Sequence, residues 1–381
     1  MEKIKIFIEK VLSIFYMLFW LFKIEPKSIV CMNFSGKGYG DSPKYIAEKI
    51  LTNSPEYKIY WVYSKMMKSD DQFPERIITI KKNSLKYFYC LATSKYWISN
   101  NRMNIFIRKR KKQIYIQTWH GGLALKKIEY DAQDKLSRLY TEVMKVDNNK
   151  IDYLISNSDF CTKMYRNAFK YKGKILEIGT PRNDILIMNN EEVIEKVRKY
   201  YRLKDEKILL YVPTFRNSYD KNPYDINFKL LKNELEKNGE KWKIIIRLHP
   251  KINNPQELIN DFNSFINGGE YPDIQELICA TNLIITDYSS TMFEGMIANK
   301  PVILYANDID LYMNERGYYF SFEELPFEIA TTNNELIKVI SAEKFTNFSK
   351  KYAEFSKNVG LKEYGKASEY IADLILHGKI F

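Results

Sequence analysis

Two of the three histidines in this sequence follow strand-like apolar runs, where folds built from strands and helices present reactive side chains. His120 is followed by Gly121 and Gly122, and His249 is followed by Pro250. Imidazole titrates near neutral pH, so it can accept a proton from a hydroxyl group. The two glycines let a second molecule approach His120 on a tight turn. His120 is therefore a candidate general base, and the alternative is a histidine that packs in the core or caps an element.

A hydroxyl-rich segment could bind phosphate at the start of a helix. It follows the apolar run Leu283–Thr286 and reads Asp287-Tyr288-Ser289-Ser290-Thr291-Met292-Phe293-Glu294. Thr291 and Glu294 match a capping box, which predicts that a helix begins here. Free backbone N–H groups and the positive dipole end of a helix attract anions, and the hydroxyl side chains add donors. Because most capping boxes bind no ligand, this segment alone is weak evidence for a phosphate site. Only the neighbouring segments strengthen that hypothesis.

Two further segments carry charged side chains at strand ends. Thr214 and Arg216 follow the run Ile208–Pro213, and a guanidinium placed there suits bidentate phosphate binding. The alternative for Arg216 is a surface ion pair. Arg182-Asn183-Asp184 follows another such run at the expected domain hinge. These three residues could orient an acceptor or lock the interdomain helix, and the sequence favours neither.

Two weaker patterns do not match an established ligand site. The loop Ser35–Gly40 is rich in glycine, but it fits neither the GxxxxGK[ST] nor the GxGxxG spacing of phosphate loops. We expect a flexible loop there. Asp308 and Asp310 have the spacing of a carboxylate pair that binds magnesium, but a polar turn after a strand is the favoured interpretation. We therefore predict no metal site and no cofactor.

The elements that position these segments alternate between strand and helix patterns, as in α/β proteins. Two successive series predict two doubly wound α/β domains, at residues 26–185 and 186–355, followed by a closing helix at 356–381. The cleft between two such domains, at the carboxyl ends of the strands, is the expected ligand site. Strands are expected at Ser28–Phe34, Tyr57–Tyr63, Arg76–Ile80, Lys95–Ser99, Ile114–Trp119, Asp152–Ser156, Lys174–Gly179, Ile208–Pro213, Lys243–Leu248, Leu283–Asp287 and Pro301–Tyr305.

Length and composition agree with two globular domains and an anionic partner. The chain has 381 residues, with 45% hydrophobic residues, which argues against disorder. Its 59 Lys and Arg against 47 Asp and Glu give a net charge of +12, which favours nucleic acid, phospholipid or a phosphorylated substrate. The basic residues are dispersed, so no nucleic-acid module is indicated. Four scattered cysteines exclude a disulfide scaffold and a thiolate zinc site.

The sequence pattern of the N-terminus, residues 1–25, predicts an amphipathic helix that lies on a membrane. The apolar run Val11–Phe22 is shorter than the roughly 17–25 residues that a spanning helix needs, and no cleavage site follows it. It is rich in aromatic residues and flanked by lysines, as are helices that lie in a membrane interface. The basic run Arg108–Lys112 would add attraction to anionic lipid. The alternative is a helix that packs on the protein's own surface.

Taken together, these segments resemble the CDP-glycerol glycerophosphotransferase family, which includes teichoic-acid-type polymerases and primases. Any one motif is unspecific, but seven in the family's order are specific, and they span roughly residues 110–325. The first 110 residues resemble the family loosely. The matching segments are Thr118–Gly121, Gly179–Asp184, Pro213–Arg216, Arg247–Pro250, Thr286–Ser290, Asn299–Pro301 and Arg316–Phe320.

The resemblance implies a GT-B-like fold and transfer of a polyol phosphate from CDP-glycerol or CDP-ribitol to a hydroxyl of a lipid-linked acceptor, with release of CMP. It implies a peripheral enzyme on the cytoplasmic face of the membrane, bound to the inner leaflet, in teichoic acid or capsule-type polymer synthesis. His120 and His249 would be catalytic. The donor would bind Arg216, Thr214, Arg247, Asp287, Ser289, Ser290, Thr291 and Glu294, and the acceptor would bind Gly121, Lys126, Lys127, Arg182, Asn183 and Asp184.

Two other interpretations stay open at this level. A GT-B glycosyltransferase with a CMP-sialic-acid-like donor also fits an HP motif and a hydroxyl-rich helix start. A basic protein that binds lipid or polymer through a degenerate site is the alternative outside enzymes. The sequence does not distinguish glycerol from ribitol, or a primase from a polymerase.

Overall fold

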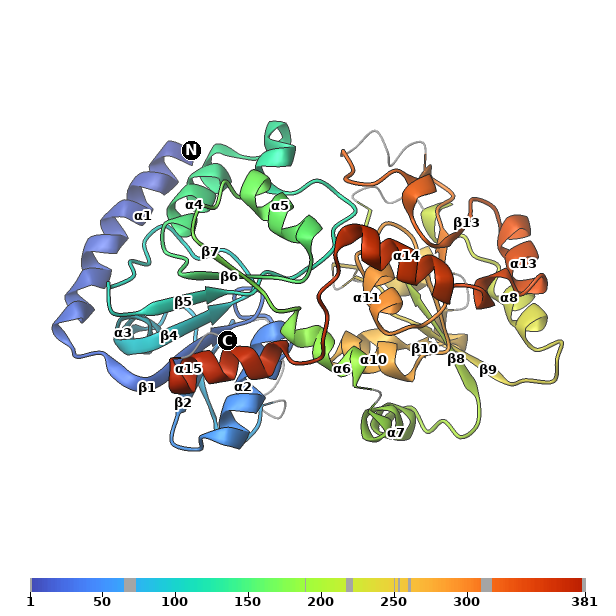
Figure 1. Ribbon diagram of the computed structural model, residues 1–381, viewed down its shortest axis with the longest axis horizontal. Helices are drawn as coiled ribbons and strands as arrows, with labels where there is room; N and C mark the ends of the chain where they lie inside the picture. The colour runs from blue at the N-terminus through green and yellow to red at the C-terminus, as the bar shows by residue number, and fades with distance from the viewer. Residues whose placement is uncertain are drawn as a thin grey trace. The chain divides into compact units, whose positions relative to one another are not determined.

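The computed structural model divides the chain into two compact units (Figure 1). It describes residues 2–64, 73–188, 190–216, 222–249, 251–252, 254–259, 262–309 and 317–378. Unit 1 contains Met1–Gly122, Ile128–Asp184 and Leu361–Phe381, and unit 2 contains Leu123–Lys127 and Ile185–Gly360. The α/β fold class expected from the alternation is confirmed by these two units, each built on a parallel sheet.

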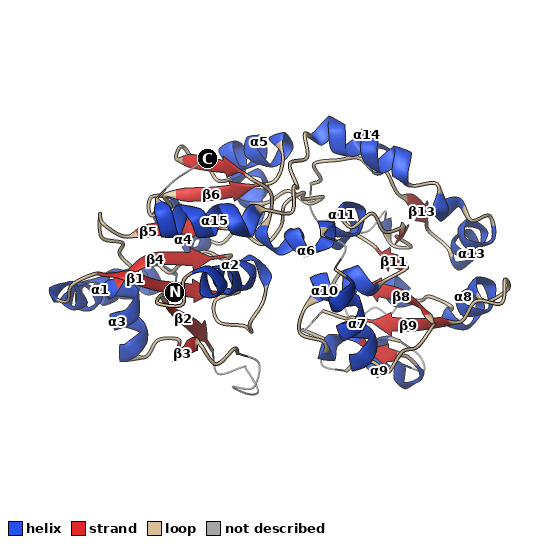
Figure 2. Cartoon of the chain, turned by 60° about the horizontal axis from the view of Figure 1, so that its bottom comes forward, coloured by secondary structure: helices blue, strands red, loops and turns tan. Residues whose placement is uncertain are grey.

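Unit 1 is built on a seven-stranded parallel sheet in the order β3-β2-β1-β4-β5-β6-β7. Helices α2 and α15 lie side by side, although more than 300 residues separate them in the chain (Figure 2). The strands are β1 Glu25–Met32, β2 Lys58–Tyr63, β3 Ile77–Lys81, β4 Ser94–Ser99, β5 Ile114–Gln117, β6 Tyr153–Ser156 and β7 Lys174–Glu177. The helices are α1 Glu2–Met17, α2 Asp41–Asn53, α3 Leu85–Thr93, α4 Arg138–Asn148, α5 Asp159–Ala168 and α15 Ala367–His377, with 3-10 turns η1 Leu18–Leu21, η3 Glu129–Lys135 and η4 Pro181–Asn183.

The central strands of unit 1 are buried along continuous apolar runs. Ile29 to Met32 of β1 are all buried, because a parallel sheet is covered on both faces. The core between this sheet and helices α2 and α15 contains Ile29, Trp61, Ile46 and Ile371. This packing fixes the carboxyl ends of β1, β4 and β5, from which the polar loops of unit 1 emerge.

The N-terminal helix leaves most of its apolar side chains uncovered. Only Ser13 and Tyr16 of α1 are buried, whereas Phe7 is 67% exposed and Phe15 is 61% exposed. The helix ends at Met17 and continues as the 3-10 turn η1, so the apolar run is not one continuous α-helix. Among the described helices, none combines the length and the apolar character that a membrane crossing requires.

Unit 2 is built on a six-stranded parallel sheet in the order β10-β9-β8-β11-β12-β13. Two strands were not predicted, β10 and β13, because each is only two or three residues long and lies at an edge of the sheet. The strands are β8 Lys207–Val212, β9 Trp242–Ile246, β10 Ile266–Asn267, β11 Leu283–Thr286, β12 Val302–Tyr305 and β13 Glu328–Ala330. The helices are α6 Asp184–Ile187, α7 Glu191–Tyr200, α8 Phe228–Leu235, α9 Pro255–Leu258, α10 Ile274–Ala280, α11 Thr291–Ile297, α13 Asn333–Ser341 and α14 Ser349–Val359.

Two segments belong to a different unit from the one that their position in the sequence suggests. Leu123–Lys127 lies in unit 2, where the Lys127 N–H donates to the Gly317 carbonyl (2.8 Å) and the Tyr319 N–H donates to the Leu125 carbonyl (2.8 Å). The C-terminal segment from Leu361 returns to unit 1. The expected division into 26–185, 186–355 and a closing helix at 356–381 therefore differs from the two units at residues 123–127 and after residue 360. Contacts between residues far apart in the sequence determine to which unit these segments belong.

Candidate active site

His120 lies near the start of the loop after β5, with one ring nitrogen held by the backbone. Its Nδ1 is 2.7 Å from the carbonyl oxygen of Asn100, which follows β4. A carbonyl only accepts, so Nδ1 carries the proton and Nε2 keeps its lone pair. β4 and β5 are neighbours in the sheet, and this adjacency brings the two loops together. The arrangement suits a base that accepts a proton at Nε2.

Two aromatic rings pack against the His120 imidazole, which is half-buried. Trp119 stacks on it with ring centroids 4.2 Å apart, and Phe34 lies 5.3 Å away. Burial lowers the pKa of His120, against the opposing effects of the Asn100 carbonyl and Asp41, because a charged imidazolium is poorly solvated there. The neutral form that a general base needs therefore predominates at neutral pH.

Asparagines on the loops after β1 and β4 build the frame around His120. Asn100 Nδ2 donates to Asn33 Oδ1 (2.8 Å), and the Phe34 N–H donates to Asn100 Oδ1 (2.7 Å). Asn101 Nδ2 donates to Ser35 Oγ (3.0 Å). Sequence reasoning missed these residues, although amides directly after the apolar strand β4 were a signal that could have found them.

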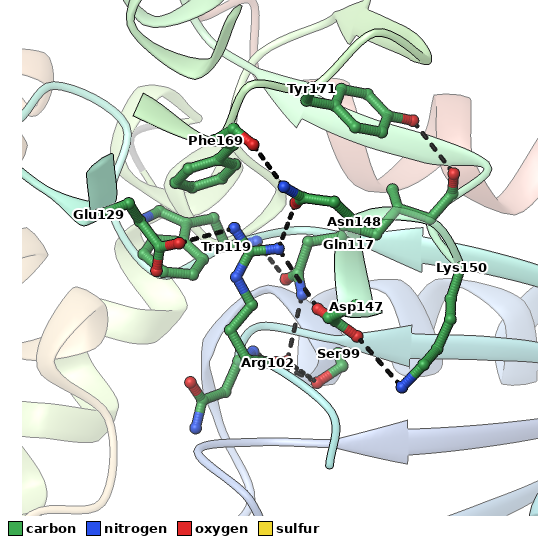
Figure 3. Close-up of polar contacts among 12 residues, drawn as sticks. Ser99, Arg102, Gln117, Trp119, Glu129, Asp147, Asn148, Lys150, Phe169 and Tyr171 are labelled. Atoms are coloured by element: carbon green, nitrogen blue, oxygen red, sulfur yellow. Dashed lines mark hydrogen bonds and ion pairs between the residues drawn. The ribbon is translucent and has the colours of Figure 1, made fainter. Parts of the chain in front are cut away.

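A buried ion cluster supports Trp119 from below (Figure 3). The Arg102 guanidinium lies 5.5 Å from the Trp119 ring centroid and 4.4 Å from the Phe169 ring centroid. The same guanidinium donates to Glu129 (2.9 Å) and to Asn148 (2.7 Å). Arg102 therefore connects three elements to the indole that stacks on His120.

Two more charged residues complete the cluster: Asp147 of α4, and Lys150 in the turn that follows α4. Asp147 Oδ2 is 3.4 Å from Arg102 Nη1, and Asp147 Oδ1 is 3.9 Å from Lys150 Nζ. Burial lowers the pKa of Lys150 to about 8, and it raises the pKa of Asp147.

Trp119 adopts a left-handed backbone conformation (φ 54°), and its N–H donates to Gln117 Oε1 (2.9 Å). Such a conformation is costly for a bulky residue and persists where the surroundings enforce it.

The segment Arg182-Asn183-Asp184 forms contacts within unit 1. Arg182 pairs with Asp41 (2.5 Å), and Asn183 Nδ2 donates to Glu363 Oε1 (2.8 Å). Asp184 accepts the N–H groups of Ala367 (2.9 Å) and Ser368 (2.7 Å) at the start of α15. All three side chains are buried; Asn183 and Asp184 hold the C-terminal segment in place, and Arg182 is tied to α2.

In unit 2, Arg216 is engaged in a buried ion-pair network. Its Nε and Nη2 atoms donate to Asp308 (2.8 and 3.1 Å), and Nη2 lies 2.9 Å from Asp287. Its Nη1 donates to the Thr214 carbonyl (2.7 Å). Neither the predicted phosphate fork nor the alternative surface ion pair describes Arg216, because two carboxylates from other loops occupy the guanidinium.

Asp287 connects the loop after β11 to the loop after β8. It accepts the Thr214 N–H (2.8 Å), the Thr214 hydroxyl (2.5 Å) and the Tyr288 N–H (2.6 Å). The Tyr288 hydroxyl donates to Asp308 (2.8 Å). Burial opposes ionisation of Asp308, but the hydrogen bond and the charge of Arg216, together with the hydrogen bond from Tyr288, lower the Asp308 pKa. These charged groups connect the loops after β8, β11 and β12 and stabilise them.

The predicted capping box at Thr291 is wrong. Ser290 is the N-cap of α11, Thr291 is the first helical residue, and Glu294 accepts from Gln275 Nε2 (3.2 Å). The N–H groups of Thr291, Met292 and Phe293 already donate to Ser289 Oγ, Ser289 O and Ser290 O. The segment therefore offers the half-exposed hydroxyls of Ser289 and Ser290, and the backbone donors expected from a free helix start are used within the turn.

His249 and Arg247, in the loop after β9, have different environments. His249 is exposed, and its Nδ1 accepts the Lys251 N–H (3.2 Å), so Nε2 carries the proton. Arg247 donates to the carbonyl oxygens of Gly268 (2.6 Å) and Tyr271 (2.5 Å) and anchors that loop. β8 separates β9 from β11 in the sheet, so the loops with His249 and Ser289 emerge from strands two positions apart.

The residues predicted to bind the acceptor near His120 belong to different units. The Gly121 carbonyl accepts from the Tyr165 hydroxyl (2.9 Å) within unit 1. Lys126 and Lys127 belong to unit 2, where Lys126 bridges to Tyr318. The other predicted positions, Pro250, Asp310 and Arg316, lie outside the described residues.

The family model for CDP-glycerol:poly(glycerophosphate) glycerophosphotransferase matches residues 14–377. The chain belongs to this family. The predicted family resemblance is thereby confirmed, and so is the prediction of an enzyme. The match covers the loops that carry His120, Arg216, His249 and Ser289.

Curated relatives of this glycerophosphotransferase family are enzymes of teichoic acid synthesis. The chain is 34% identical to the teichoic acid poly(glycerol phosphate) polymerase of Staphylococcus epidermidis over 92% of its length, and it spans about half (51%) of that relative. It is 30% identical to the polymerase of the same name from Bacillus spizizenii, with 96% of both chains covered. It is 30% identical to the teichoic acid glycerol-phosphate transferase of Staphylococcus aureus, with 93% and 94% covered.

Solved structures confirm the GT-B-like fold. The wall teichoic acid polymerase TagF, solved as a histidine-to-asparagine variant with CDPG, matches with a TM-score of 0.83 and 32% identity over 96% of this chain and 93% of that chain. A UDP complex of MnaA from S. aureus matches with a TM-score of 0.54 and 14% identity, over 92% of this chain and 96% of that chain, which shows a shared fold alone.

Proposed function

We propose that the chain transfers glycerol phosphate from CDP-glycerol to a hydroxyl of a membrane-linked polyol-phosphate acceptor, with release of CMP, in teichoic acid synthesis. The observation that carries the proposal is His120, in a chain of this family, with Nδ1 held by Asn100 and the Nε2 lone pair available. Glycerol is favoured over ribitol because four relatives named for glycerol phosphate are 30–34% identical, whereas three named for ribitol phosphate are 26–29% identical. A glycerol-phosphate primase is 26% identical, so the preference rests on the polymerases and the transferase.

The chemical step breaks the phosphoanhydride bond of the donor and forms a phosphodiester bond to the acceptor. The acceptor hydroxyl oxygen attacks the phosphorus that carries glycerol, and the bond from this phosphorus to the CMP oxygen breaks. His120 Nε2 takes the hydroxyl proton, and CMP leaves with the electron pair of the broken bond. The lowered pKa of His120 keeps the imidazole neutral before the step, so the base is ready at neutral pH.

Unit 2 would bind the donor through His249 and the hydroxyls of Ser289 and Ser290. The Nε2–H of His249 is a donor that can contact a diphosphate oxygen, and its exposure leaves it accessible to a ligand. Arg216 would act indirectly: by pairing with Asp287 and Asp308 it fixes the loop that presents Ser289. This assignment replaces direct phosphate binding by Arg216 and Arg247.

The enzyme would act at the inner leaflet as a peripheral membrane protein. The uncovered apolar side chains of α1 and η1 support this proposal, because soluble proteins rarely expose so many neighbouring large apolar residues. The lysines at positions 3, 5, 10 and 23 would add attraction to anionic lipid. An acceptor carried by a lipid would then be met in the plane of the membrane.

The deciding experiment offers the full chain CDP-glycerol, CDP-ribitol and CMP-sialic acid in parallel, each with a lipid-linked polyol-phosphate acceptor. Released CMP and product mass are measured. We expect CMP release and a glycerol phosphate increment with CDP-glycerol alone. An increment from CDP-ribitol would reassign the donor, and a sugar increment without phosphorus would identify a glycosyltransferase and overturn the proposal.

A further inference from the structure

An apolar groove lies between the N-terminal turn and α3 in unit 1. Its walls are Phe15, Phe19 and Phe22 on one side and Leu85 and Phe88 on the other, and Phe106 belongs to the same lining. The aromatic rings hold one another, since Phe88 packs against Phe19 (6.3 Å between centroids) and edge-on against Phe106 (5.7 Å). No charged side chain belongs to the lining that the described residues form.

The size of the groove selects what can occupy it. Its volume is about 340 Å³. An apolar cavity of about 150 Å³ already binds benzene, so the groove has room for a longer apolar group. Two turns of an α-helix, as a cylinder 10 Å across, would need roughly 850 Å³. The groove therefore has room for a stretch of hydrocarbon chain, and it is too small to enclose a helix of a partner protein.

Basic residues lie near the groove, and they favour an occupant with a negatively charged head group. Lys23 follows Phe22, and Lys86 lies between two residues of the α3 wall region, Leu85 and Tyr87. Arg110 donates to the Phe22 carbonyl (2.8 Å), so the basic run Arg108–Lys112 begins beside the same groove. A phosphate group at the Phe22 end of the groove would lie close to Lys23 and Arg110.

We propose that this groove binds one acyl chain of an anionic phospholipid drawn from the bilayer, with the phosphate beside Lys23 and Arg110. The proposal rests on the membrane attachment proposed above and goes further, because surface docking needs no groove. Apolar burial of the chain stabilises the complex, and the cations select the negative head group. The N-terminal turn would thus be held on α3 partly by lipid.

The groove is tested by photochemical labelling of the full chain. Vesicles of anionic phospholipid carry a trace of a phospholipid with a diazirine midway along one acyl chain, and adducts are mapped by peptide mass spectrometry. We expect adducts on Phe15–Phe22 and on Leu85–Phe88. Adducts confined to the outer side chains Ile4, Phe7 and Ile8 would overturn the groove and leave surface docking intact. The absence of any adduct would overturn both the groove and the attachment, while transfer to a soluble acceptor would still test the chemistry.

A filling substitution separates occupancy of the groove from membrane affinity. Leu85 is 77% exposed, so Leu85→Trp keeps the surface apolar, reduces the groove and is tolerated by the fold. We expect groove adducts to fall about tenfold, the change that loss of burial of roughly two methylene groups produces. Vesicle binding should stay unchanged. The matched control is Leu230→Trp on α8, where the leucine is 52% exposed, and it should change neither quantity. Equal labelling of Leu85→Trp and the unaltered chain would refute the groove.

Discussion

At His120, the Asn100 carbonyl holds one ring nitrogen and thereby defines the chemistry of the other. Replacement of His120 by alanine removes the base, and general bases typically contribute about 10²–10⁴-fold to turnover. We expect kcat to fall by that range while affinity for CDP-glycerol, measured by calorimetry, stays within error, because the donor is assigned to unit 2. His377→Ala, at the exposed end of α15, is the matched control. A parallel loss of donor affinity would show that His120 has a different role.

The same residue predicts the acid limb of the pH profile. Below the pKa of His120 the imidazole is protonated and cannot accept a proton, so kcat/KM rises with pH through that value. Burial lowers this pKa, so the limb should lie below the ordinary value of about 6.5. The unaltered chain is measured from pH 4.5 to 8, with circular dichroism at each pH to exclude unfolding. A limb above 6.5 would contradict the neutral, half-buried imidazole.

His249 makes the complementary prediction for the donor. Because its Nε2–H is assigned to the diphosphate, His249→Ala should weaken CDP-glycerol binding about tenfold, the value of one hydrogen bond to a charged group. Turnover should fall at least as much, since the contact is kept in the transition state. Calorimetric titration is the measurement, with His377→Ala again as the reference. Unaltered affinity would remove His249 from the donor site.

At the scale of elements, Asp184 shows how one side chain anchors a helix from a remote part of the chain. It accepts two N–H groups at the start of α15, from Ala367 and Ser368. Asp184→Ala should lower the free energy of unfolding by about 1–2 kcal/mol, as for loss of a helix cap. Urea unfolding measures this, and Glu369→Ala, an exposed position on the same first turn, should have a negligible effect. Equal effects of the two substitutions would show that the cap contributes nothing specific.

The buried cluster that joins the β4 loop, η3 and α4 predicts a pH-dependent stability. The pKa of Lys150 is about 8 in the folded protein, against an ordinary 10.5. Between these values the unfolded chain binds a proton that the folded chain does not, so the folded state gains stability as pH rises. The gain reaches up to about 3 kcal/mol. Lys150→Met should abolish it, and exposed Lys229→Met should not.

The measurement compares urea unfolding of the three proteins at pH 7.5 and pH 9.5. Tyrosines and cysteines with raised pKa values act in the opposite direction over this range, so the informative quantity is the difference between variants. A Lys150→Met protein with the same pH dependence as the unaltered chain would show that Lys150 remains charged when folded.

Local sequence patterns predicted the strands and the positions of the loops, but not which side chains pair. The continuous apolar runs of β1, β8 and β11 are recognisable because both faces of a parallel sheet are covered. Arg216 could not be interpreted correctly, because its partner Asp308 lies 92 residues away on another loop. Asn100 was overlooked for the same reason, since its carbonyl meets His120 only when β4 and β5 pair.

For the whole molecule, the N-terminal apolar surface predicts how the protein finds its acceptor. Deletion of α1 would uncover Phe88 and Phe106, so outward substitutions are the better test. Ile4 and Phe7 are 63% and 67% exposed, and the double change Ile4→Ser, Phe7→Ser should leave the fold intact. Each lost side chain should weaken binding to anionic vesicles about tenfold, since burial of a large apolar side chain contributes at least ~1.5 kcal/mol. Co-sedimentation at low and high salt separates this apolar part from the attraction of the lysines, which salt screens.

Transfer to a lipid-embedded acceptor should fall with vesicle binding, whereas transfer to a short soluble acceptor should not. Leu230→Ser on unit 2 is the control and should change neither. If the double variant sediments like the unaltered chain, the N-terminal helix is not the membrane anchor, and the acceptor must be reached through another surface.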